Sequence, residues 1–237
     1  LPKGTFKKVA LVADLDSSAT LSHTFYITTS GVTATGASTG ESASVTYSSS
    51  SKQTISKGTS TLTVTKDSSS PTADIIIGGN KGVELGVFRL AANNVEDLDL
   101  DQITLSSTHG TYVDTFYFYD DEGNLLGTKP GADSATLVVG DGTLTIPANG
   151  HKEITVKADL LPVDGTTITN GQTVKVGLEA SNNVQTTGLS SGTDVNSSAG
   201  AYGNSMTVYK SRPYFAKNST SPSGNLFPST STNVAIF

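Results

Sequence analysis

Residues 146–160 read IPANGHKEITVKADL, and residues 1–15 read LPKGTFKKVALVADL. Both stretches begin with an apolar residue and a proline, pass through glycine and lysine, and end in Ala-Asp-Leu after an alternating run. Alternation of apolar and polar residues is typical of a β-strand with one buried face. Asn149-Gly150 precedes the run in the second stretch, and both residue types tolerate the positive φ of tight hairpin turns. The two stretches therefore predict the same β-structure twice.

The similarity continues along the chain at a nearly constant spacing. GASTGES at 36–42 aligns with GLSSGTD at 188–194, and Leu62–Lys66 aligns with Met206–Lys210. The spacing is roughly 145–150 residues, which is the size of one ordinary domain. We therefore predict a repeat protein whose copies begin out of phase with the ends of the chain.

The phase of the repeat predicts three parts. These are the C-terminal part of a β-sandwich repeat at 1–58, a complete repeat at 59–205, and the N-terminal part of the next repeat or an assembly strand segment at 206–237. Two explanations are open: the chain is an excerpt of a longer array, or the head of one subunit is completed by the tail of the next through strand addition. Simple completion has a difficulty, because the equivalent of residues 89–145 is missing from both ends together.

Short alternating runs about ten residues apart, separated by Gly, Asn and Asp turns, indicate strands throughout. We find no convincing amphipathic helix. The predicted fold class is all-β, with tandem immunoglobulin-like or jelly-roll β-sandwich domains. The expected strands are 6–12, 23–28, 43–47, 60–65, 73–77, 83–91, 98–105, 114–119, 135–139, 153–158, 172–180 and 206–210. In the strand 114–119, Phe116 and Phe118 are expected in the core, with Tyr117 and Tyr119 on the opposite face.

The composition limits the classes of partner. Charged residues make up 15% of the chain and the formal net charge is −6, which gives no reason to expect nucleic acid or an anionic membrane. The absence of cysteine excludes disulfides and thiolate sites. No apolar run is long enough to span a bilayer. A Ser- and Thr-rich, β-friendly composition of this kind is associated with an extracellular or cell-surface location.

Acidic residues form the candidate metal site. Asp97, Asp99 and Asp101 alternate with leucines, so on a strand their carboxylates share one face and could ligate Ca²⁺. The alternative is a solvated acidic face that discourages edge pairing. Asp120–Glu122 form a second cluster, for which turn chemistry is the expected role. Asp159 and its repeat counterpart Asp14 are expected to be structural, capping a turn through backbone N–H groups.

No motif indicates catalysis. The chain lacks a Gly-x-Ser-x-Gly elbow and a phosphate-binding glycine loop, and its three histidines do not have metal-site spacing. We therefore predict that the chain is not an enzyme. Asn196 and Asn218 match the N-glycosylation pattern, although chance matches are expected in a chain this rich in Ser and Thr.

The stretches GTLTIPANGHKEITVKADL at 142–160 and GNSMTVYKSRP at 203–213 resemble tandem β-sandwich repeat domains of secreted prokaryotic surface proteins of the S-layer, stalk or fibre type. The resemblance implies a mechanical role in coats, fibres or stalks, and many proteins of this type bind Ca²⁺ at domain junctions.

We therefore expect a structural subunit of an extracellular filament, pilus-like fibre or S-layer that self-assembles into a homopolymer or lattice. The alternative is an adhesin or carbohydrate-binding module in which Tyr112, Tyr117 and Tyr119 stack on glycans. The residues expected to assemble are Met206, Val208, Val234, Ile236 and Phe237.

Overall fold

The computed structural model describes residues 1–14, 16, 22–46, 52–178, 182–213 and 216. Within these ranges the chain is all-β, and its helical elements are two 3₁₀ turns, Thr29–Gly31 and Gly110–Tyr112. This confirms the predicted all-β class, and the tandem arrangement of domains stays a prediction. The strands are β1 His23–Phe25, β2 Gln53–Ile55, β3 Leu62–Lys66, β4 Ile75–Ile77, β5 Val83–Ala92, β6 Leu98–Thr108, β7 Val113–Tyr119, β8 Leu125–Pro130, β9 Ser134–Val138, β10 Thr145–Ile146, β11 His151–Leu160, β12 Gln172–Leu178, β13 Val184–Gly188, β14 Asp194–Asn196, β15 Ala201–Tyr202 and β16 Met206–Tyr209.

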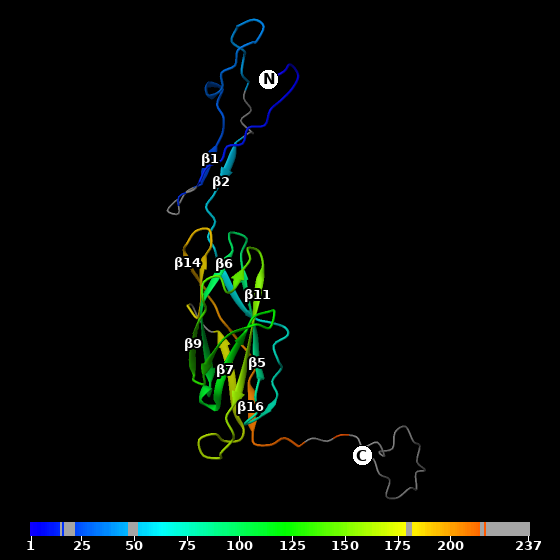
Figure 1. Cartoon of the computed structure of the whole chain (residues 1–237), viewed down its shortest axis with the longest axis vertical. Helices are drawn as coiled ribbons and strands as arrows, with labels where there is room; N and C mark the ends of the chain where they lie inside the picture. Colours follow the sequence, from blue (N-terminus) through cyan, green and yellow to red (C-terminus); the bar gives the residue numbers. More distant parts are fainter. Residues whose placement is uncertain (15, 17–21, 47–51, 179–181, 214–215, 217–237) are drawn as a thin grey trace, which may run out of the picture.

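Strands β3 to β16 form a β-sandwich (Figure 1). One layer is a five-stranded antiparallel sheet in the order β3-β5-β11-β7-β8. The other layer follows the order β14-β13-β6-β12-β16-β4, with β9 and β10 along β6 and β15 along β12. In this second layer β16 and β4 run parallel. The apolar faces of both layers contribute to one continuous core.

The core follows the alternation that the sequence predicts. On β11, Ile154, Val156 and Ala158 are fully buried, and the side chains between them are partly exposed. On β7, Phe116 and Phe118 are fully buried, while the tyrosines between and beyond them are half-buried. The expected division of this aromatic strand is therefore confirmed.

The described part of residues 1–58, which we call the N-terminal segment, lies beyond one end of the sandwich (Figure 1). In its described part β1 pairs with β2, and Thr35 and Ser42 form an isolated antiparallel bridge. The remaining backbone is the 3₁₀ turn Thr29–Gly31, other turns and coil, with mostly exposed side chains. The strand predicted at 6–12 is wrong, since these residues form no strand. The strand predicted at 43–47 is also wrong over residues 43–46. Alternation makes a strand possible, but a strand needs neighbours to satisfy its backbone N–H and C=O groups.

The sandwich continues beyond the boundary predicted at residue 206. Strand β16 pairs with β12 and with β4, and the side chains of Met206 and Val208 are 2% and 1% exposed. This strand therefore completes the sandwich of residues 59–205 and does not begin a separate one. The repeat origin of the two end segments stays a prediction.

Candidate functional site

Residues 6–14 match β11 in sequence but not in environment. With the spacing of the repeat, Val9 and Leu11 correspond to Ile154 and Val156. The two β11 residues are fully buried between β5 and β7, whereas Val9 is 81% exposed and Leu11 is 74% exposed. Within the part of the chain that the structure describes, residues 6–14 pair with no strand. They therefore present an apolar face that a sheet could cover.

The assembly residues predicted in the last part of the chain are not shown to be exposed in the way that residues 6–14 are. Met206 and Val208 are core residues of the sandwich, so they are not available as an assembly surface in the folded domain. This corrects their assignment, and the reason is that β12 and β4 already flank β16 on both sides. Val234, Ile236 and Phe237 lie outside the described residues.

Two of the three aspartates predicted as metal ligands come together. One oxygen each from Asp99, Asp101 and Asp141 lies within 4.8 Å of the others. Asp97 is not part of this group, and its Oδ1 accepts a hydrogen bond from the Ala148 backbone N–H at 2.6 Å. Asp141 lies in the Gly140-Asp141-Gly142 turn, and nothing in its local sequence indicates that the turn folds back onto β6.

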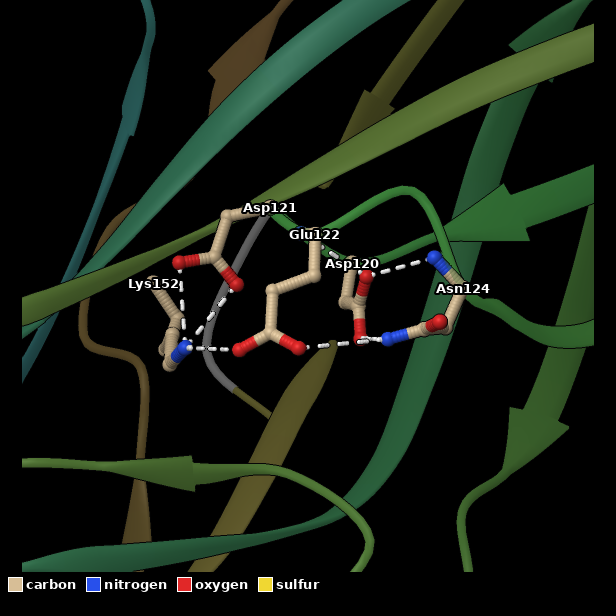
Figure 2. A network of polar contacts seen from close by, with 5 residues as sticks. All are labelled: Asp120, Asp121, Glu122, Asn124 and Lys152. Carbon is tan, nitrogen blue, oxygen red and sulfur yellow. Dashed lines mark hydrogen bonds and ion pairs between the residues drawn. The ribbon is translucent and has the colours of Figure 1, made fainter.

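The acidic cluster at the tip of the β7–β8 hairpin is a turn cap (Figure 2). Asp120 accepts hydrogen bonds from the backbone N–H groups of Glu122 and Asn124 and from the Asn124 side chain. Partial burial alone would raise the pKa of Asp120, but these hydrogen bonds outweigh it and lower the pKa. Asp121 lies 3.0 Å from the Nζ of Lys152 on β11. The hydrogen bond to Asp121 raises the pKa of Lys152.

Glu96 is a buried carboxylate that sequence reasoning missed. It accepts hydrogen bonds from the Ser60 and Ser191 hydroxyls and from the backbone N–H groups of Ser190 and Ser191. Burial raises the pKa of Glu96, but the hydrogen bonds outweigh burial, so the pKa is lower than that of an ordinary glutamate. The carboxylate therefore joins the chain entering the sandwich to the loop between β13 and β14. All four donor groups belong to serines, which do not stand out in a chain this rich in serine.

The expected cap at Asp159 is confirmed. Its Oδ1 accepts the backbone N–H of Gly82 at 2.8 Å, and its Oδ2 accepts the Tyr117 hydroxyl at 3.2 Å. Lys81 lies 3.7 Å from the same Oδ2. Gly82 and Lys81 lie in the turn before β5, and Tyr117 lies on β7. The repeat counterpart Asp14 has no such turn or strand beside it in the described chain.

No model of a known protein family matches the chain, and no curated protein matches it. Among solved structures, the chain is similar to the seventh ScaB type I cohesin from Pseudobacteroides cellulosolvens, with 15% identity and a TM-score of 0.33 over 67% of this chain and 98% of that one. It is also similar to a family 123 glycoside hydrolase from Clostridium perfringens, with 12% identity and a TM-score of 0.28 over 62% of this chain and 27% of that one. Both TM-scores are too low to support a function.

The remaining candidates are the two glycosylation asparagines and the three tyrosines expected to bind glycans. Asn196 is exposed on β14, and Asn218 lies outside the described residues. Tyr112 is buried and so cannot stack on a glycan, which corrects its expected exposure. Tyr117 and Tyr119 are half-buried, and the Lys157 ammonium lies over the Tyr119 ring. Among the described residues, no helix is long and apolar enough to cross a membrane.

Proposed function

We propose that the chain is a structural subunit of an extracellular filament, a pilus-like fibre or an S-layer, and that it acts mechanically without catalysis. Its partner is a second copy of the same chain, with which it forms a homopolymer or lattice. The observation that carries this proposal is the contrast between residues 6–14 and β11. A segment with the pattern of a buried central strand stands outside the sandwich with its apolar side chains in solvent.

An added strand is a natural way to cover such a segment. Main-chain hydrogen bonds to an exposed sheet edge supply affinity, and alternate side chains supply specificity. In the five-stranded sheet, β8 is an outer strand, and in the described chain its ladder partner is β7. The half-exposed Leu125 on β8 adds apolar surface at this edge. We therefore expect residues 6–12 of one copy to pair with an outer strand of the next.

The path of the chain supports linear assembly. The N-terminal segment extends from one end of the sandwich, and residues 210–213 leave from the opposite end (Figure 1). Because the chain enters and leaves the sandwich at opposite ends, a pulling force on linked subunits would act along the long axis of the sandwich. The N-terminal segment lies beyond the end of the sandwich and not against its sheets, which favours pairing between copies (Figure 1).

The test compares two neighbouring substitutions, Leu11→Asp and Val12→Asp. In the β11 pattern Leu11 corresponds to buried Val156, whereas Val12 corresponds to Lys157 on the outer face. Both side chains are exposed now, so neither change disturbs the folded subunit. Light scattering after size exclusion and negative-stain microscopy should show polymers for the unsubstituted protein and for Val12→Asp, but monomers for Leu11→Asp.

Two results would contradict the proposal. One is an unsubstituted protein that stays monomeric at all concentrations, with and without CaCl₂. The other is equal loss of assembly in both variants, which would indicate general stickiness instead of an inward-facing strand. An adhesin or carbohydrate-binding role is the alternative proposal, and the burial of Tyr112 weakens its expected aromatic platform. A glycan array with hits that Tyr119→Ala removes would favour that alternative.

A further inference from the structure

Three carboxylates meet on the outer side of β6, away from the segment on which the assembly proposal depends. One oxygen each from Asp99, Asp101 and Asp141 lies within 4.8 Å of the others. The ion pairs found among the described residues involve other acidic groups, so no lysine or arginine neutralises these three. Like charges this close repel one another, and a cation between them would reverse the sign of that interaction.

The Asp99 carboxylate also has an unsatisfied oxygen. The residue is only 7% exposed, although it projects from the side of β6 opposite to the core leucines Leu98 and Leu100. Its Oδ2 accepts the backbone N–H of Gly142 at 2.7 Å, but its Oδ1 is buried and has no hydrogen-bond partner. A buried carboxylate oxygen without a partner is costly, and bound metal is one of the usual ways to satisfy it.

A β-bulge places the second carboxylate. In the β6–β13 ladder Gln185 pairs with Gln102 and Thr186 pairs with Leu100, so Asp101 has no opposite residue. Such bulges re-aim side chains and are common beside functional sites. The Thr187 hydroxyl of β13 donates to Asp101 Oδ2 at 2.9 Å, which holds that carboxylate beside Asp99.

The loop between β9 and β10 supplies the third carboxylate. Its turn is closed by a hydrogen bond from the Thr143 N–H to the Gly140 carbonyl at 3.0 Å. Gly142 has a φ of +70°, a conformation that a side chain would strain, and its N–H is the donor to Asp99. The turn thus covers Asp99 and brings Asp141 over the outer side of β6.

We propose that Asp99, Asp101 and Asp141 bind one Ca²⁺ ion, which fastens the 139–144 loop to β6. Ca²⁺ is a hard cation that takes six to eight oxygen ligands in flexible geometry, and carboxylates are its usual charged ligands. Water and backbone carbonyls complete the coordination. The ligand set differs from the strand triplet expected from the sequence, because Asp97 is replaced by Asp141. This site requires no assembly and is expected in the monomer.

The experiment measures ⁴⁵Ca²⁺ by equilibrium dialysis and thermal unfolding in CaCl₂ on the full chain. The variants are Asp141→Asn and Asp99→Asn, and the matched control is Asp97→Asn. We expect one Ca²⁺ per chain, with a dissociation constant of about 10⁻⁴–10⁻³ M, as in extracellular modules. At a concentration about a hundred times that constant, the unfolding midpoint should rise by roughly 5–10 °C.

The variants separate the proposed site from a general acidic surface. Asp141 is exposed, so Asp141→Asn should fold normally and weaken Ca²⁺ binding at least about tenfold. Asp99→Asn should also lose binding, and Asp97→Asn should bind like the unsubstituted protein. If the unsubstituted chain binds no Ca²⁺ at a concentration of about 10⁻² M, the proposal is overturned. Equal weakening by Asp97→Asn and Asp141→Asn, which would indicate a general acidic surface, would also overturn it, as would weakening by Asp97→Asn but not by Asp141→Asn, which would favour the strand triplet.

Discussion

Residues 6–14 and residues 151–159 have closely related sequences and opposite environments. In the sandwich, Ile154 and Val156 are enclosed by β5 on one side and β7 on the other. In the N-terminal segment, Val9 and Leu11 are in solvent, and no strand flanks them in the described chain. The comparison shows that an alternating pattern encodes the capacity to be a strand, whereas burial depends on the strands that surround it.

The largest expected difference is in apolar packing. Ile154→Ala leaves a cavity in the core and should lower the free energy of unfolding of the sandwich by about 2–5 kcal/mol. The equivalent change Val9→Ala should leave that free energy unchanged, because Val9 contacts solvent. Urea unfolding of the monomer followed by circular dichroism measures both. A comparable loss in the two variants would mean that residues 6–14 are packed in solution.

The next difference concerns buried carboxylates. Glu96→Ala leaves the backbone N–H groups of Ser190 and Ser191 without their acceptor and should cost about 1–3 kcal/mol. The exposed Glu41 in the N-terminal segment is the control, and Glu41→Ala should have no effect.

The Glu96 contribution should also depend on pH. Because the folded pKa of Glu96 is below its ordinary value of 4.5, the stabilisation is fully present above that pH and is lost as the pH falls through the folded pKa. Unfolding measured from neutral to acidic pH should therefore show the Glu96→Gln variant converging on the unsubstituted protein in acid. A constant difference across that range would contradict this role for the carboxylate.

A smaller difference is expected at the shared Ala-Asp-Leu ending. Asp159→Ala removes the acceptor for the Gly82 N–H and the Tyr117 hydroxyl and should cost about 1–2 kcal/mol. Asp14→Ala should cost nothing in the monomer. Hydrogen exchange at the Gly82 amide gives a local measurement, since its protection should fall in Asp159→Ala and stay unchanged in Asp14→Ala.

The smallest difference is in surface charge. Lys152 bridges to Asp121 and Glu122 at the β7–β8 tip, and its repeat counterpart Lys7 has no such pair among the ion pairs found in the described chain (Figure 2). Lys152→Met should lower stability only slightly, and the loss should shrink in high salt. Since the pKa of Lys152 is raised, its contribution is present at neutral pH and is lost as the pH rises past 10.5. Thermal unfolding at low and high NaCl, with Lys7→Met as the control, measures the difference.

Long alternating runs were predictable, and short strands were not. The sequence predicts β5, β6, β7, β11 and β12 because their alternating or apolar runs extend over many residues. It misses the short β10, β14 and β15 and the more polar β13, since two to five residues with few apolar side chains resemble turns. The repeat boundary at residue 206 was misplaced because similarity to β3 says nothing about which sheet β16 joins.

In the candidate metal site, too, some ligands were predictable from the sequence and others were not. Asp99 and Asp101 are predictable because neighbouring positions on one strand share a face. Asp141 is forty residues beyond Asp101, and its place over β6 depends on the β9–β10 connection and on the bulge at Asp101. Asp97 is excluded by its hydrogen bond to the Ala148 N–H, a contact between segments that local spacing cannot reveal.

By itself, the sequence determined that this protein is built from β-strands, which of their faces are apolar, and that residues 1–15 repeat the pattern of 146–160. These properties are local, since side-chain alternation and turn residues act within a few positions of the chain. The tertiary structure decided that one copy of the pattern is a core strand and the other is exposed, that β16 closes the sandwich, and that Asp141 joins Asp99. Each of these depends on contacts between distant segments, whose partners are set by sheet order and register.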